Sequence, residues 1–488
     1  MSATKRHSLL ALAVFVTSLT GIAQAQAQAV DTPPQPGAPR PFAIRPPVEQ
    51  RLANGLRVVL AERRGVQLVT AQLVVLSGSE VDPPERAGLA SMTAGLLTKG
   101  TRNHSATQLA QAAESLGGAL DSGSGWHQSE VAITVSVPKL DPALALVAEV
   151  VQQPAFAPAE LDRLRTQSLD ELKVAYSQPG RLASLAAQRL LYGAGAYGHP
   201  ASGTPASLAK ITRAELVALH AARYRPDNAV LVLAGDLDAE TALRLARRHF
   251  GAWKTAGGAT PAVVTLANTA LPQTAAAIDM PQSGQAAVIV AAALPPLGAD
   301  RATAAVLNSV LGGGFSSRLN QEIRIRRGLS YSAGSGLDAR PGGGSLRAVV
   351  QTKNESAAEV VTLVQAELDR LAAAPVSADE LAARKATLIG DFSRSVETTA
   401  GLGAAVKSLI VAGLPADDLR TRIQALSAVD AADVQRYATA NLGPGGRRVV
   451  VAGESAKFVD ALRGASPSVV IVPAARLDLD LGTGLSAP

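Results

Sequence analysis

The chain of 488 residues repeats itself at a nearly constant distance, and this repeat limits the folds that it can adopt. Leu161 and Leu381 each lie in the first turn of a charged helical pattern, 220 residues apart. An apolar, β-branched run also ends at Gly235 in the first half and at Gly453 in the second, 218 residues apart. A fixed period of this kind is typical of a duplicated unit. We therefore expect two homologous domains of about 220 residues in tandem; coincidence among Ala-rich helices is the alternative.

Within the first repeat, strand signals come before helix signals. Asn54-Gly55 between apolar runs is a strong signal for a hairpin turn, and residues 67–76 are apolar and β-branched enough for a strand. Ala- and Leu-rich patterns of helical period follow. They cover residues 88–97, 106–116, 142–151, 158–176, 181–192 and 213–224. We expect an α+β fold, in which each domain is a β-sheet with helices packed on one face.

The N-terminus has the pattern of an exported protein. Lys5 and Arg6 precede a mostly apolar stretch, residues 9–23, and Ala-Gln-Ala repeats offer small-residue cleavage sites up to Ala29. We predict a signal peptide over residues 1–29 and export to a bacterial periplasm. A membrane anchor is the alternative, although the stretch is shorter than the roughly 20 residues that span a bilayer, and no later apolar run predicts a transmembrane segment.

Composition removes several classes of function. Because the chain has no cysteine, it cannot form disulfides, iron–sulfur clusters or Cys-ligated zinc sites, and it has no thiol nucleophile. Only 3% of its residues are aromatic, which argues against the stacking surfaces that bind single-stranded nucleic acid. The sequence also lacks a P-loop and the GxSxG motif of serine hydrolases. We expect no nucleic-acid partner.

The histidines do not form a local metal site. No two of them have the spacing of four residues that places both rings on one helical face, so neither HExxH nor its inversion HxxEH is present. We interpret each one as a surface or turn residue. The six are His7, His104, His127, His199, His220 and His249.

Short motifs in both halves fit a single family. They are Asn54-Gly55-Leu56, Gly78-Ser79 with Pro83-Pro84, Gly88-Leu89-Ala90, Leu96 to Thr101, Leu311 to Leu319, and Arg327 to Ser332. Through these motifs the chain resembles the insulinase-like (M16, pitrilysin-type) peptidases from about Glu49 to Leu462. The resemblance implies two domains similar to those of the mitochondrial processing peptidases, in agreement with the repeat.

The chain departs from this family where active members carry HxxEH. The matching positions are residues 91–95, with Ser91 and Gly95 in place of the two histidine ligands. Ala94 replaces the glutamate that would activate a zinc-bound water, so the general base is also absent. The resemblance therefore implies that this chain binds no catalytic zinc.

Two further positions complete the comparison with active members. Glu171 matches the third zinc ligand by spacing, but one carboxylate without its two imidazoles supplies neither the coordination number nor the affinity for zinc. We interpret Glu171 as a solvated helix residue. Asp121 stands where active members usually have Asn.

The second half keeps two residues that the resemblance assigns to catalysis. Arg324 and Tyr331 match an Arg and a Tyr, seven residues apart, that reach the zinc site in the family. A phenol hydroxyl can stabilise the oxyanion that forms on a peptide carbonyl, and a guanidinium can hold substrate. The alternative is structural: Tyr331 packs beside the sheet and Arg324 makes a surface ion pair.

Some exported members of the family work as pairs, in which one chain carries HxxEH and the other the Arg and Tyr. The resemblance implies that this chain is the second kind: a zinc-free subunit of a periplasmic heteromeric metallopeptidase, inactive alone, with zinc held by its partner. Unfolded peptides would add as strands to a sheet edge, for which residues 342–352 are one candidate. The alternatives are a non-catalytic scaffold or peptide-binding subunit of an envelope assembly, and a peptidase active alone through an unrecognised site.

These observations predict the following order along the chain. It is a signal peptide over 1–29, a Pro-rich tether over 30–48, an N-terminal M16-like domain without the zinc motif over 49–254, a linker over 255–274, a C-terminal M16-like domain with the Arg and Tyr over 275–462, and a tail over 463–488.

Overall fold

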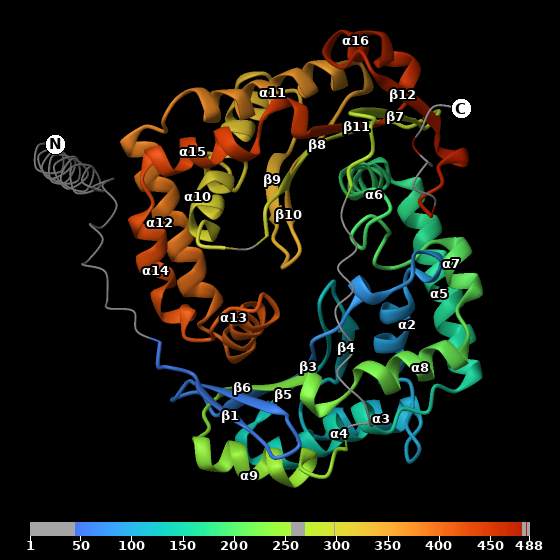
Figure 1. Ribbon diagram of the computed structural model, residues 1–488, viewed down its shortest axis with the longest axis vertical. Coiled ribbons are helices and arrows are strands. Elements are labelled where there is room, and N and C mark those ends of the chain that lie inside the picture. Colours follow the sequence, from blue (N-terminus) through green and yellow to red (C-terminus); the bar gives the residue numbers. More distant parts are fainter. Residues whose placement is uncertain (1–43, 255–268, 297, 481–484, 486–488) are drawn as a thin grey trace, which may run out of the picture. The chain divides into compact units, whose positions relative to one another are not determined.

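The computed structural model describes residues 44–254, 269–296, 298–480 and 485 (Figure 1). The predicted signal peptide, most of the predicted tether and most of the predicted linker lie outside these residues. The described chain forms two six-stranded sheets, each accompanied by helices. The predicted α+β fold with two tandem domains is confirmed.

The first sheet forms around the predicted hairpin. β1 and β2 pair antiparallel on either side of Asn54-Gly55, and Gly55 takes the positive φ of 94° that favours glycine in such a turn. The order across the sheet is β1-β2-β6-β3-β5-β4. Its strands are β1 (Val48–Arg51), β2 (Arg57–Glu62), β3 (Leu68–Val75), β4 (Asp121–Ser124), β5 (Ser129–Ser136) and β6 (Ala229–Gly235).

The helices predicted in the first half are all present, with ends that differ from the prediction by up to two residues. They are α2 (Leu89–Leu96), α3 (Ala106–Ser115), α4 (Leu140–Gln152), α5 (Pro158–Ser177), α6 (Pro179–Tyr192) and α8 (Arg213–Arg223). The structure adds α7 (Pro205–Lys210) and α9 (Ala239–Phe250), which the sequence patterns did not predict.

The second sheet repeats the topology of the first. Its order, β12-β7-β11-β8-β10-β9, matches the first sheet in the five strands from β7 to β9. The edge strand differs: β12 follows β11 along the chain and runs parallel to β7, whereas β1 precedes β2 and runs antiparallel to it. Its strands are β7 (Ala275–Asp279), β8 (Ala286–Leu294), β9 (Ala333–Asp338), β10 (Gly344–Thr352), β11 (Arg447–Gly453) and β12 (Val469–Pro473). The edge strand β12 lies in the residues that we assigned to the tail.

One prediction about this sheet is wrong. Residues 342–352 were a candidate for an edge that accepts a peptide, but β10 pairs with β8 on one side and with β9 on the other. A β-branched run led by glycines does not distinguish a central strand from an edge strand. The pattern indicates that the side chains on both faces are buried, and it does not indicate how many strands the backbone pairs with. The edge on this side of the sheet is β9.

Seven helices with bounds in the described part of the second half surround this sheet. They are α10 (Arg301–Leu311), α11 (Ala357–Ala373), α12 (Ala378–Ser395), α13 (Thr399–Val411), α14 (Asp418–Ala428), α15 (Ala431–Asn441) and α16 (Val459–Ala465). Among all helices of the described residues, none combines the length and the apolar character needed to cross a membrane.

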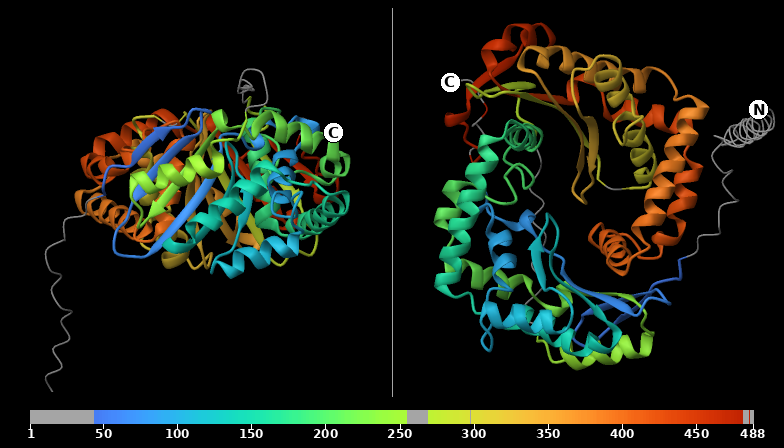
Figure 2. Two further views of the ribbon diagram at one scale, coloured as in Figure 1. Left: turned by 90° about the horizontal axis from the view of Figure 1, so that it is seen from below. Right: turned by 180° about the vertical axis from the view of Figure 1, so that it is seen from behind.

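The central strands of each sheet are buried on both faces, and the second face is covered by the other half of the chain. In β6, alternate residues enter two cores: Leu231 and Leu233 face the helices of the first half, whereas Val230 and Val232 face a core that contains α13. The second sheet is covered in the same way by α6 from the first half. Figures 1 and 2 show α13, in orange, beside the first sheet and α6, in green, beside the second.

Polar contacts join the halves at the same places. The hydroxyls of Thr70 on β3 and Thr399 on α13 are 2.9 Å apart, and Lys407 on α13 lies 2.7 Å from a carboxylate oxygen of Glu130 on β5. The described residues accordingly belong to a single compact unit that begins at Ile44.

Candidate functional site

The residues at the zinc-motif positions all lie on α2, a short helix whose start is fixed by a buried carboxylate. Asp82 accepts hydrogen bonds from the backbone N–H groups of Gly88 at 3.0 Å and Ala90 at 2.9 Å. These are donors that the first turn of a helix cannot satisfy within itself. No family motif indicates Asp82 as a cap, because it reaches α2 across a short 3₁₀ turn, Pro84–Arg86, rather than from the usual adjacent position.

A second buried acid lies next to this cap. Glu80 is only 5% exposed, and its carboxylate accepts a hydrogen bond from the backbone N–H of Gly78. Burial raises the pKa of Glu80 to about 7 and raises that of Asp82 well above its ordinary value. The sequence does not indicate either pKa shift, since both acids lie in a segment rich in turns and charged residues.

The residues present on α2 and α5 do not fit a zinc ion. Ala94 is fully buried, and a side chain at Gly95 would begin 3.2 Å from the Cδ2 methyl of Leu164 on α5. Glu171 is exposed on α5 and accepts a hydrogen bond from Gln167 at 2.9 Å. Nowhere in the described chain do three His, Cys, Asp or Glu residues group closely enough to hold a metal ion. Leu164 therefore occupies space on the side of α2 where the second histidine of the motif would start.

Arg324 and Tyr331 lie together in the second half. The guanidinium carbon of Arg324 is 4.7 Å from the centre of the Tyr331 ring and 5.0 Å from that of Phe315. A cation over the face of an aromatic ring is attracted by the negative charge on that face. The Tyr331 side chain is 86% exposed, and Arg324 makes no ion pair with any described residue. Neither part of the structural alternative, packing of the tyrosine or pairing of the arginine, is seen.

The backbone that carries Arg324 is a π-helical segment, Asn320–Arg326. Such segments are rare and occur often at functional sites. Glu322, which is 6% exposed, accepts hydrogen bonds from Arg326 at 2.8 Å and from Arg327 at 2.9 Å and 3.1 Å. Through these contacts Glu322, near the start of the segment, is joined to Arg326 and Arg327 at its end, which holds the backbone around Arg324 in place.

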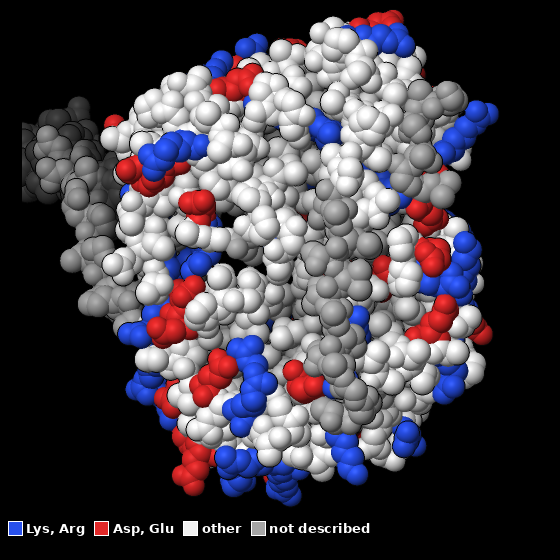
Figure 3. All heavy atoms as spheres, viewed as in Figure 1, with Lys and Arg blue, Asp and Glu red and all other residues white. Residues whose placement is uncertain are grey.

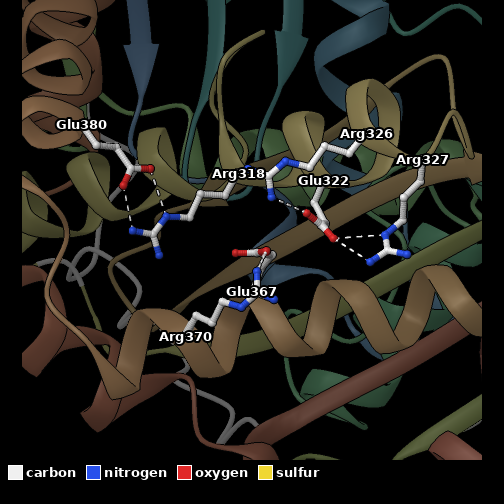
Figure 4. Close-up of polar contacts among 7 residues, drawn as sticks. All are labelled: Arg318, Glu322, Arg326, Arg327, Glu367, Arg370 and Glu380. Carbon is white, nitrogen blue, oxygen red and sulfur yellow. Dashed lines mark hydrogen bonds and ion pairs between the residues drawn. The ribbon is translucent and has the colours of Figure 1, made fainter.

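The same charged cluster continues to the neighbouring helices. Figure 4 shows Arg318 facing Glu380 of α12, and Glu367 beside Arg370 on α11. Arg318 donates two hydrogen bonds to the Glu380 carboxylate, at 3.0 Å and 2.8 Å. Because Glu367 is buried, its pKa is raised. No sequence pattern indicates this cluster, because its members are separated by up to about 60 residues and share no motif.

The predicted site residues form two groups in the structure. It places Arg324 beside Tyr331, and it places Ser91, Ala94 and Gly95 on α2. No hydrogen bond or ion pair in the described chain links the two groups. The Arg324–Tyr331 pair therefore makes no polar contact with the altered motif among the described residues.

The histidines are only in part the surface or turn residues expected. His220 on α8 and His249 on α9 lie in helices and are partly buried. His199 lies in the turn-rich segment after α6 but is only 2% exposed, and its Nε2 atom has no hydrogen-bond partner among the described residues. It packs with its ring centre 5.5 Å from that of Trp126. A lone histidine in a turn-rich sequence gives no indication that residues from a distant hairpin will cover it.

Comparisons with known proteins agree with this fold. Residues 57–203 match the family model described as insulinase (peptidase family M16), and residues 210–388 match the one described as peptidase M16 inactive domain. An uncharacterized zinc protease of Mycobacterium leprae is 30% identical over 71% of this chain and 78% of its own length. A similar protein of Bacillus subtilis is 25% identical over 71% of this chain and 83% of its own length.

Solved structures give the same answer. The M16 inactive domain of Pseudomonas fluorescens is 28% identical, with a TM-score of 0.78, over 83% of this chain and 98% of its own. The first half of the periplasmic protease PqqL from Escherichia coli has a TM-score of 0.69 over 87% of this chain and 95% of its own, and at 16% identity it supports the fold alone. From the two matched family models, the curated relatives and the duplicated sheets, we conclude that this chain belongs to the M16 (insulinase-like) peptidase family.

Proposed function

We propose that the chain is a zinc-free subunit of a periplasmic heteromeric M16 metallopeptidase and that it contributes Arg324 and Tyr331 to a site whose zinc is held by an HxxEH-bearing partner. The observation that carries the proposal is a contrast within one chain. The cation and the exposed phenol are paired, while the helix that would carry the zinc motif has a buried alanine and a close-packed glycine.

The exposure of Tyr331 argues for a partner. A hydrogen bond to a developing oxyanion contributes most where water is excluded, yet 86% of this side chain is open to solvent. A second subunit that covers the pair would remove that water. Stacking of the guanidinium on the ring would keep the phenol oriented, so that its hydroxyl donates to the peptide carbonyl while Arg324 holds a neighbouring acceptor of the substrate.

Cleavage of an unstructured, fluorescence-quenched peptide tests this role. The measurements compare the mature chain alone, an HxxEH-bearing family member from the same organism alone, and their mixture. We expect only the mixture to cleave. Tyr331→Phe should lower the kcat of the mixture by about 100-fold, as for loss of one oxyanion donor, while KM changes little.

Arg324→Ala should mainly raise KM, because substrate binding is lost before transition-state stabilisation. Arg420→Ala is the matched control, since this exposed arginine on α14 makes only a surface pair with Asp417. Size-exclusion chromatography of each mixture separates loss of assembly from loss of catalysis. If the variants assemble with the partner and cleave as fast as the unaltered mixture, the shared site is wrong and the chain is a scaffold or peptide-binding subunit.

A further inference from the structure

A cavity between the halves has no place in the proposed function. Its volume is about 820 Å³, within the range of roughly 300–1,000 Å³ that is usual for small-ligand sites. It lies under the β4–β5 turn of the first half and is bounded by the β9–β10 hairpin and by α10, α13 and α14 of the second. The face shown in Figure 3 is hollowed near the positions of β9, β10 and α13.

The cavity wall is largely apolar. It includes Leu294, Leu337, Leu414 and Leu419, together with the ring of Trp126 from the first half. A wall of this kind favours a ligand with an apolar body and leaves specificity to a few polar groups.

The cations in the wall are paired with carboxylates, with one exception. Arg301 donates to Asp418 at 2.6 Å, and Lys407 pairs with Glu130. Arg340 pairs with Asp338 and lies 4.2 Å from the centre of the Trp126 ring. These three cations are therefore already neutralised by carboxylates of the chain.

Arg422 on α14 is the exception. Its guanidinium, which is partly buried, has neither a hydrogen-bond acceptor nor a carboxylate partner among the described residues. Burial, and then the neighbouring Arg301 cation, lower the pKa of Arg422, and no nearby carboxylate opposes them. A partly desolvated cation held next to a second cation is unfavourable until an anion joins it.

Other features of the wall are consistent with an anion on the Arg422 side. The hydroxyls of Ser408 on α13 and Tyr437 on α15 line the cavity, and no described residue within hydrogen-bond distance pairs with them. The wall also holds the carboxylate of Asp300, which has no ion pair among the described residues; after burial, its charge raises the pKa of Tyr437. The cavity thus offers a cation and hydroxyl donors next to an apolar chamber.

We propose that this cavity binds the carboxylate end of an apolar chain, with Arg422 as the group that receives the carboxylate. The C-terminus of a short apolar peptide and a medium-length fatty acid share this chemistry. The site is independent of the proposed role of Arg324 and Tyr331, because no residue of that pair lines the cavity.

Isothermal titration calorimetry with the mature chain tests the proposal. The probes are acetyl-Leu-Leu-Leu with a free carboxylate, the same tripeptide as its C-terminal amide, and octanoate. We expect a carboxylate probe to bind about tenfold or more tightly than the amide, because a hydrogen-bonded charge pair is lost in the amide. A change in Trp126 fluorescence on binding locates the probe in this cavity, since the other tryptophan, Trp253, is buried in the core of the first half.

Substitutions on α14 distinguish the loss of the Arg422 contact from the general effect of removing a positive charge. Arg422→Gln should weaken binding of the carboxylate probe to the level of the amide. Arg422→Lys, which keeps the positive charge, should keep the preference for the acid and is the variant to use if Arg422→Gln folds poorly. Arg420→Gln, two residues away on α14 and exposed, should change nothing. Arg422-dependent binding of the tripeptide supports a peptide end as ligand, and Arg422-dependent binding of octanoate alone supports a fatty acid. Equal binding of acid and amide, or unchanged binding by Arg422→Gln, overturns the proposal.

Discussion

At the scale of single residues, the altered zinc motif is more than a loss of ligands. Replacement of two histidines and a glutamate by Ser91, Gly95 and Ala94 removes the donors, and the packing of α5 against α2 then uses the space. Because protein interiors are close-packed, a position once filled by a neighbour does not accept a large side chain without strain.

This packing makes a prediction about Gly95. Gly95→His should destabilise the chain by about 1–3 kcal/mol, because the new side chain meets Leu164 from its first carbon onward. Leu164→Ala should be destabilising alone but should recover part of the loss in the Gly95→His background. Urea denaturation of the two single variants and the double variant measures the coupling. Additive effects would show that Leu164 does not fill this space, and Gly95→Ala, which adds only the first of these carbons, should be less destabilising than Gly95→His.

Glu80 gives a prediction about pH. Its pKa is about 7 in the folded chain, above the value of about 4.3 expected when unfolded, so the folded state holds the extra proton between these values. Stability from this group is therefore present at low pH and is lost as the pH rises from about 4.5 to 7.

The variant Glu80→Gln keeps an acceptor for the Gly78 N–H and cannot ionise. We expect it to be more stable than the unaltered chain at pH 8, by up to about 3 kcal/mol, and equally stable at pH 4.5. Chemical denaturation at a series of pH values checks this. A stability difference that stays constant with pH would mean that Glu80 does not titrate with the raised pKa.

At the scale of helices and strands, α13 depends on a small residue to approach the first sheet. A side chain at Gly403 would begin 2.9 Å from the Oε1 atom of Gln72 on β3 and 3.5 Å from the Cβ of Ala234 on β6. Gln72 can move, so the contact tolerates one carbon more readily than a branched side chain.

Gly403→Leu should therefore lower the free energy of unfolding by about 1–3 kcal/mol, since it forces the helix away from the sheet. Ala404→Leu, on the exposed side of the same helix, should have little effect. Thermal denaturation of the two variants compares them directly. If both variants unfold at the same temperature, α13 is not packed as closely as its contacts indicate.

The sequence predicts the helices and strands better than it predicts how they pack. The Asn54-Gly55 hairpin, the helices and the duplication were predictable, because turn chemistry and periodicity are local or repeat along the chain. The cover of each sheet by a helix from the other half was not, since an Ala-rich pattern such as that of α6 shows that one face is buried but not what buries it. For the same reason, the sequence does not indicate which distant residues form the Asp82 cap, the cluster around Glu322 and the cavity beside Arg422.

At the scale of the whole molecule, the two halves complete each other. The face of the first sheet that holds Val59, Val230 and Val232 is covered by α13, and the face of the second that holds Ile289 and Val450 is covered by α6. Neither half, taken alone, would have a cover for this face, and an apolar face left open to water is the usual mark of a surface that must associate.

This reciprocity predicts that cutting the chain between Lys254 and Thr269 leaves the halves bound to each other. A protease site placed in this interval and cleaved after folding should give two fragments that elute together from a size-exclusion column and unfold in one transition. Each half expressed alone should bind a dye for exposed apolar surface, and mixing the halves should abolish this binding. Two fragments that separate and fold stably by themselves would contradict the prediction, and would show that the cores around α6 and α13 contribute little to the stability of the sheets.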